Sequence, residues 1–181
     1  MKSGQRRRNR LTENDCVQAA RHVVYEFRQF AHARVHYSEL RGTLNPHMAL
    51  ECRVLHHRIL LEFFHFDLAS RKQRNVLAAD YADGWKTTRP PWFKDYIQRC
   101  HRMLAHISLD RCDLDADWGS WWGADPNQDV EGHLLCQIRV FLRDLPAPFR
   151  AASRTHLRNY PDASQLAKLF CFALTGPVLV S

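Results

Sequence analysis

The chain lacks the features that mark secreted, membrane-spanning or zinc-binding proteins. Its six cysteines stand singly, without a Cys-x-x-Cys pair, so we expect reduced thiols that serve as small core residues. Its longest mostly apolar stretch, 166–180, contains Lys168, Gly176 and Pro177 and falls short of the roughly 20 residues that a membrane-spanning helix needs. The N-terminus is basic but is not followed by an apolar signal core. We therefore expect a cytoplasmic protein with no membrane segment.

Other missing motifs exclude whole classes of enzyme. There is no His-Glu-x-x-His pair, and the spacing from Glu51 to His56 puts these side chains about 140° apart on a helix, which is a poor arrangement for zinc. No glycine-rich phosphate loop and no nucleophile elbow are present, which excludes P-loop enzymes and elbow-type hydrolases. We expect neither a metal nor a cofactor. The alternation of apolar and polar residues that is typical of strands is also nearly absent.

Basic residues and histidines are abundant. Lys and Arg number 26 against 19 Asp and Glu, which gives a net charge of +7, and the chain has 11 histidines. This balance permits an anionic partner such as RNA. Part of the excess lies in residues 1–11, which we predict to be a flexible basic tail ahead of a single domain at 12–181. Such a tail either binds phosphates without sequence preference or only aids solubility.

Apolar residues recur at helical spacing along most of the chain, which predicts an all-α fold. Thr12 and Asp15 form a capping box, Asn45-Pro46 starts a second helix, and Pro146 ends the last long one. The expected architecture is a four- or five-helix up-and-down bundle with an irregular C-terminal extension, in which only a short helix near 150–160 and another near 164–174 are conceivable. The expected helices are 12–37, 46–68, a short piece at 76–82, one from Pro91 to near Arg111, and one that follows Asp125-Pro126 and ends at Leu145.

The helix at 46–68 is apolar on two sides and is therefore expected to be central. One side carries Val54, Leu61 and Phe64, and Leu55, Ile59 and Phe63 cover much of the other. The polar cluster of this helix is a candidate site and consists of Glu51, His56, His57 and Arg58. Glu51, Arg58 and Glu62 share one edge and predict an ion-paired ladder, while His57 lies on the apolar face, where a core residue is the simpler interpretation.

The helix from Pro91 carries the strongest candidate for chemistry. Arg99, Arg102 and His106 form one polar ridge beside the buried stripe, and Arg99 and His106 are separated by about 10 Å of helical rise. A guanidinium stabilises charge on a phosphate oxygen and an imidazole moves a proton, so this ridge is a candidate catalytic site. An ordinary solvated helix edge is the alternative. In the following loop, Trp118, Trp121 and Trp122 either stack on bases or cap the core.

Two blocks of sequence carry a resemblance to known proteins. Glu51, His56 and Arg58 form a Glu-x4-His-x-Arg block that runs into an aromatic-ended apolar stretch, and Ala-His-x-Ser-x2-Arg occupies 105–111. Together they span about 60 residues and resemble a family of bacterial helical proteins similar to HEPN bundles. Many HEPN proteins are metal-independent ribonucleases in which four to six residues separate an arginine from a histidine, at a dimer cleft. Arg99 and His106 fit this spacing, whereas Arg102, with three residues between, does not.

The resemblance implies a homodimer that binds or cleaves RNA. In the catalytic version, His106 moves protons and Arg99 stabilises the charge that develops on the phosphate. A non-catalytic helical interaction module, such as the partner or neutraliser in a two-protein system, is the alternative. In that version the His and Arg residues serve packing and helix pairing.

Overall fold

The computed structural model describes residues 11–43, 46–66, 75–105 and 129–158; the side chains of 34–43, 46–50, 102–103, 105, 154 and 157–158 are not described. These residues form six α-helices and no strand, which confirms the all-α class. The helices are α2 (Glu13–Thr43), α3 (Pro46–His65), α4 (Ala78–Tyr81), α5 (Phe93–Ala105), α8 (Val130–Asp144) and α9 (Ala147–Arg158).

Local capping explains where the long helices begin. The Thr12 hydroxyl accepts a hydrogen bond from the Asp15 backbone N–H at 3.1 Å, and the Asp15 carboxylate accepts one from the Thr12 backbone N–H at 3.0 Å. The predicted capping box is therefore present. Helix α8, which is expected after Asp125-Pro126, begins at Val130, where the carboxylate of Asp129 accepts a hydrogen bond from Gly132 N–H at 2.8 Å and caps the helix. Pro146 follows the last residues of α8, as predicted.

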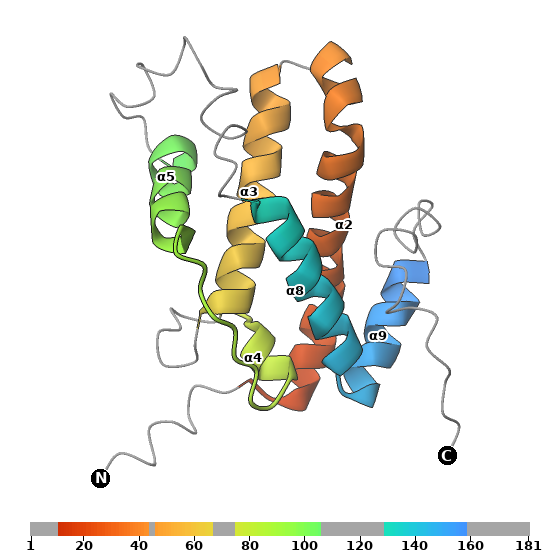
Figure 1. Ribbon diagram of the computed structural model, residues 1–181. Coiled ribbons are helices and arrows are strands. Elements are labelled where there is room, and N and C mark those ends of the chain that lie inside the picture. The colour runs from red at the N-terminus through yellow and green to blue at the C-terminus, as the bar shows by residue number, and fades with distance from the viewer. Residues whose placement is uncertain (1–10, 44–45, 67–74, 106–128, 159–181) are drawn as a thin grey trace.

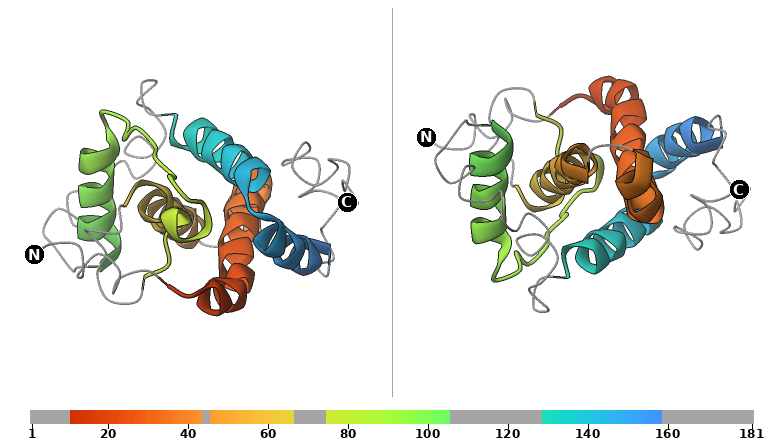
Figure 2. Two further views of the ribbon diagram at one scale, coloured as in Figure 1. Left: turned by 90° about the horizontal axis from the view of Figure 1, so that it is seen from below. Right: turned by 90° about the horizontal axis from the view of Figure 1, so that it is seen from above.

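Helix α3 lies at the centre of the arrangement. It runs antiparallel to α2, and α5 and α8 lie against its other sides (Figure 1). Views from the two ends show α3 between α5 on one side and α2 and α8 on the other (Figure 2). Helix α9 packs against α2 on its outer side. The prediction of a central helix is confirmed, and side chains of α3 therefore reach three other helices.

The core is rich in aromatic side chains. Phe27 stacks on Phe64, and both lie in edge contact with Phe141 of α8. Five apolar residues that recur at helical spacing from the start of α8 to its C-cap are buried: Val130, Leu134, Ile138, Phe141 and Leu145. Two expectations are wrong. Leu55 is 41% exposed rather than buried. Of the four cysteines in the described residues, Cys16 and Cys100 are buried core thiols, whereas Cys52 and Cys136 are exposed.

The segment from Ala82 to Trp92 connects α4 to α5 and closes the end of α3. The indole N–H of Trp85 and the hydroxyl of Thr87 donate to the carbonyl of Phe64, and the Arg89 guanidinium donates twice to the carbonyl of His65. If the helix continued, these carbonyls would accept hydrogen bonds from the backbone N–H groups of its next turn. The expectation that this helix continues to about residue 68 is therefore wrong, and α3 ends at His65.

The chain is more regular after Pro146 than expected. Helix α9 begins at Ala147 rather than near residue 150, and the Arg150 guanidinium donates to the carbonyl of Leu145 at 2.8 Å and to that of Arg143 at 3.1 Å. These bonds fix the turn between α8 and α9. The rest of the expected C-terminal extension, including the helix near 164–174, lies outside the described residues, as do residues 1–10 of the basic tail.

Candidate functional site

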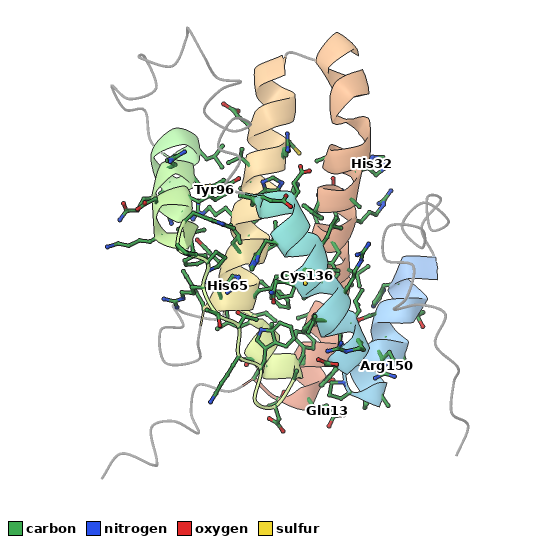
Figure 3. The ribbon with its side chains drawn as sticks, in the orientation of Figure 1. Glu13, His32, His65, Tyr96, Cys136 and Arg150 are labelled. Atoms are coloured by element: carbon green, nitrogen blue, oxygen red, sulfur yellow. The ribbon has the colours of Figure 1, made fainter. Side chains whose placement is uncertain are left out.

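Four side chains from three helices form a polar group inside the helix packing, which we call the central ion cluster: Arg53 and His57 of α3, Tyr96 of α5 and Glu131 of α8. His57 Nδ1 lies 2.8 Å from the Tyr96 hydroxyl, and its Nε2 lies 3.7 Å from Glu131 Oε1. Arg53 Nη2 lies 2.6 Å from the same carboxylate oxygen. Tyr96 extends from α5 toward α3 (Figure 3). The cluster thus ties both α5 and α8 to α3.

Burial sets the protonation state of this cluster. It lowers the pKa of His57, although the neighbouring Glu131 acts in the opposite direction, and it raises the pKa of Tyr96 well above its ordinary value. At neutral pH His57 is therefore uncharged and Tyr96 keeps its proton. Because Nε2 faces a carboxylate, the arrangement assigns the imidazole proton to Nε2, and Nδ1 accepts from the tyrosine hydroxyl. His57 is thus a hydrogen-bonded core residue, which agrees with the simpler interpretation of its position.

The other polar residues of α3 also have partners within the chain. His56 Nδ1 lies 2.7 Å from Glu26 Oε2 of α2, and the Arg58 guanidinium donates to Glu62 Oε1 at 3.1 Å. His101 of α5 approaches the same Glu62 oxygen at 3.6 Å. The predicted ladder is therefore present in its Arg58–Glu62 part. Glu51 lies half-buried two turns before Arg58.

A second polar group lies at the C-terminal end of α3 and is called here the histidine pair. His65 Nε2 and His133 Nε2 are 2.8 Å apart, and His65 Nδ1 lies 2.6 Å from the Thr87 hydroxyl. Trp92 covers His133 edge-on. Burial, together with the neighbouring His133 and Arg89, lowers the pKa of His65 to about 4. Burial also lowers the pKa of His133, against the opposing charge of Asp129. Both imidazoles are neutral at pH 7.

The hydrogen bonds define where the protons of the histidine pair lie. The Thr87 hydroxyl donates to the Phe64 carbonyl, so it accepts from His65 Nδ1–H. His65 Nε2 is then an acceptor and His133 Nε2 is the donor. The ring planes differ by 19° and the centroids are 5.0 Å apart, so the rings meet nearly edge to edge. One hydrogen bond, donated by His133 Nε2–H, therefore joins the two rings.

The predicted catalytic residues are only partly described. Arg99 lies half-buried on α5, one turn after Tyr96. Arg102 lies on the same helix, but its side chain is not described. His106 and the three tryptophans at 118, 121 and 122 lie outside the described residues. The proximity of Arg99 and His106 therefore stays a prediction.

Cys100, which follows Arg99 directly, is fully buried. Burial raises the pKa of its thiol to about 12, so it remains protonated and packs as a small core residue. This position anchors the buried face of α5, and its neighbour Arg99 lies at the flank of that face.

Several polar partners were not found from sequence. None of these partners was singled out from the sequence: Tyr96, Glu131, His65, Thr87 and His133. A usable signal exists for His65, which follows the buried Leu61 by four residues and therefore shares its side of α3. His133 likewise follows the buried Val130 by three. Their pairing depends on how α3 and α8 meet.

Comparison with known proteins identifies no relative of this chain, so the site is interpreted from its own geometry. No protein-family model, curated protein or solved structure matches the chain significantly. Within the described ranges, no group of three or more His, Cys, Asp or Glu side chains is arranged to hold a metal ion. None of the helices described is both long enough and apolar enough to cross a membrane.

Proposed function

We propose that the chain is a HEPN-like, RNA-directed helical protein that acts as a metal-independent endoribonuclease. The observation that carries the proposal is the attachment of α5 by the central ion cluster. Tyr96 bonds to His57, and the buried Cys100 lies one turn later, so the rotation of α5 about its axis is defined. Arg99 then lies at the flank of α5, between the buried face and solvent. The net charge of +7 also favours an anionic substrate.

The chemistry assigned to the site is cleavage by the neighbouring 2′-hydroxyl. His106 takes the proton of this hydroxyl, which attacks the adjacent phosphorus, and the bond to the 5′ oxygen breaks. The products are a 2′,3′-cyclic phosphate and a 5′-hydroxyl end, and a proton returns to the leaving oxygen. Arg99 stabilises the charge on the non-bridging oxygens, and Arg102 adds positive charge to the same ridge.

A cleavage assay tests this proposal. The protein lacking residues 1–10 is incubated with RNA in EDTA, because the basic tail would bind RNA unaided. Cleavage should leave 2′,3′-cyclic phosphate ends and should fall by about 10² to 10⁴ in His106→Ala, the usual contribution of positioned acid–base catalysis. Arg99→Lys should also lose activity, because an ammonium lacks the planar fork that binds two phosphate oxygens.

His101→Ala is the matched control. His101 lies on the same helix but faces Glu62 of α3, so its removal should leave cleavage within about twofold of wild type, well below the change that removal of a catalytic group causes. Equal cleavage by wild type and His106→Ala would indicate a contaminating ribonuclease and would contradict the proposal.

The proposal includes a homodimer, because HEPN-like clefts are assembled from two copies. We expect the two α5 helices to approach each other across a twofold axis. Light scattering at micromolar concentration should give twice the mass of the 181-residue chain. A monomer would remove the two-chain cleft and most of the support for catalysis.

A non-catalytic interaction module is the second candidate, and a specific observation favours it. Each of His56, His57 and Arg58 has a partner within the chain, in Glu26, Tyr96 and Glu62 respectively. Polar residues used in this way pack helices rather than bind a substrate. If His106→Ala and wild type bind RNA equally and neither cleaves it, this function replaces the catalytic one.

A further inference from the structure

A cavity of about 330 Å³ lies on the side of α3 that faces away from the central ion cluster. Its floor is apolar and includes Val23 of α2 and Ile59, Phe63 and Phe66 of α3. This volume is at the lower end of the range for small-molecule sites, which are typically apolar with a few placed polar groups. The cavity therefore suits a small ligand with an apolar body.

The polar lining of this cavity consists of two carboxylates together with His22 and Asn75. Glu26 and Glu62 both line it, and among the described lining residues there is no lysine or arginine. In each carboxylate one oxygen is engaged, Glu26 Oε2 by His56 and Glu62 Oε1 by Arg58. Within the described part of the chain, Glu26 Oε1 and Glu62 Oε2 have no hydrogen bond or ion pair. These oxygens are available to a cation.

The two carboxylates are set apart along α3. Glu26 bonds to His56, which precedes Glu62 by six residues, so the carboxylates are separated by about 9 Å along the helix axis. Ile59 lies between these levels on the cavity floor. The order along α3 is therefore an acidic group, an apolar surface and a second acidic group. A ligand that matches this order has two cationic ends joined by an apolar chain.

We propose that this cavity binds an aliphatic diamine in its doubly protonated form, with one ammonium at Glu26, the other at Glu62 and the methylene chain over Ile59. The proposal is independent of the ribonuclease proposal, since it uses neither Arg99 nor His106. Each ammonium donates a charge-assisted hydrogen bond to a partly buried carboxylate, whose side-chain exposure is 21% for Glu26 and 22% for Glu62. Anionic ligands are disfavoured by the same carboxylates.

Calorimetric titration of the full chain tests the proposal with four probes of equal chain length: diaminopentane, pentylamine, pentanediol and glutarate. Diaminopentane should bind at least about tenfold more tightly than pentylamine, because the second ammonium adds one charge-assisted hydrogen bond. The diol and the dicarboxylate should not bind. Equal affinity for the diamine and the monoamine, or no binding of the diamine at millimolar concentration, would overturn the proposal.

Variants locate the site. Glu26→Gln and Glu62→Gln should each weaken diamine binding about tenfold, to the level of the monoamine. Glu13→Gln, which removes an exposed carboxylate at the start of α2, should leave binding unchanged. If Glu26→Gln destabilises the contact with His56, Glu62→Gln still carries the test, because its partner Arg58 lies on the same helix. An equal loss in Glu13→Gln would indicate non-specific attraction and would contradict the assignment.

Discussion

The central ion cluster and the histidine pair join the same two helices by different chemistry. His57 and His65 are eight residues apart on α3, or about 12 Å along its axis, and each faces a residue of α8. At the first, a carboxylate lies between an arginine and a neutral imidazole. At the second, one hydrogen bond joins two neutral imidazoles. One junction therefore depends on charge and the other depends on the absence of charge.

This difference predicts opposite vulnerabilities. Removing Glu131 leaves Arg53 without the carboxylate that lies 2.6 Å away, in a setting where both side chains are only about one-fifth exposed. Adding a proton to His65 places a positive charge in a buried setting, close to the Arg89 guanidinium and 2.8 Å from His133. Truncation of a side chain should destabilise the first junction, and acidification should destabilise the second.

The largest effect is expected for Glu131→Ala, which should lower the free energy of unfolding by about 3 kcal/mol at pH 7. The physical reason is the loss of the carboxylate that lies against both the Arg53 guanidinium and the buried imidazole of His57. Urea unfolding followed by circular dichroism measures the change. Glu13→Ala removes an exposed carboxylate and serves as the control, with an expected loss below about 1 kcal/mol. Unfolding of both variants at the same urea concentration would show that the ion cluster does not stabilise the α3–α8 junction.

Acidification should act on the other junction. The pKa of His65 is about 4 in the folded protein and 6.5 in an unperturbed histidine, so the unfolded chain binds more protons between these values. Stability is therefore complete above about pH 6.5, falls as the pH is lowered toward 4, and changes no further from this group below that. We expect a loss of about 2 kcal/mol across this window, allowing for partial access of solvent.

His133→Gln sharpens this test. Glutamine still offers an N–H donor to His65 Nε2, but it cannot carry a second proton. The loss of stability on acidification should therefore be smaller than in wild type, while His22→Gln, which changes an exposed histidine of α2, should follow the wild-type curve. Urea midpoints measured at pH 7, 5.5 and 4 compare the three proteins. Parallel curves for wild type and His133→Gln would place the pH dependence elsewhere.

Much of the helical framework was predictable because its signals are local. Thr12 with Asp15 and the five apolar residues of α8 follow from spacing along one helix. The predicted ends were less accurate where a distant segment decides them. Helix α3 ends at His65 because Trp85, Thr87 and Arg89 bind its last carbonyls, and no pattern within α3 itself carries that information.

The site was less predictable than the fold for the same reason. The sequence placed His57 on a buried face, but its partners Tyr96 and Glu131 lie 39 and 74 residues further on. A pairing over such a separation depends on how the helices pack. The edge formed by Arg58 and Glu62 was predictable, because four residues separate neighbours on one helix.

A smaller effect is expected for the neutral part of the ion cluster. Tyr96→Phe removes the hydroxyl that bonds to His57 and should lower the free energy of unfolding by about 1 kcal/mol, the usual net contribution of one such bond. Tyr25→Phe is the matched control, because Tyr25 is exposed and should change stability by less than about 0.5 kcal/mol. A Tyr96→Phe loss as large as that of Glu131→Ala would mean that the hydroxyl, rather than the charge, governs this junction.

The smallest effect on stability is expected at Asp129, where a helix cap and the histidine pair meet. Asp129 Oδ1 accepts from Gly132 N–H at 2.8 Å, and asparagine at this position offers an equivalent oxygen. Asp129→Asn should therefore change the free energy of unfolding by less than about 0.5 kcal/mol at pH 7, whereas Asp129→Ala should lose about 1 kcal/mol.

The loss of charge in Asp129→Asn should still reach the histidine pair. The Asp129 carboxylate raises the pKa of His133 against the effect of burial, so the asparagine variant should lower this pKa further. Titration of the imidazole resonances by NMR measures the shift, with Asp144→Asn, a carboxylate at the other end of α8, as the control. An unchanged His133 pKa in Asp129→Asn would mean that the charge of the cap does not act on the pair. The two junctions of α3 would then differ only in their own side chains and not in the charges around them.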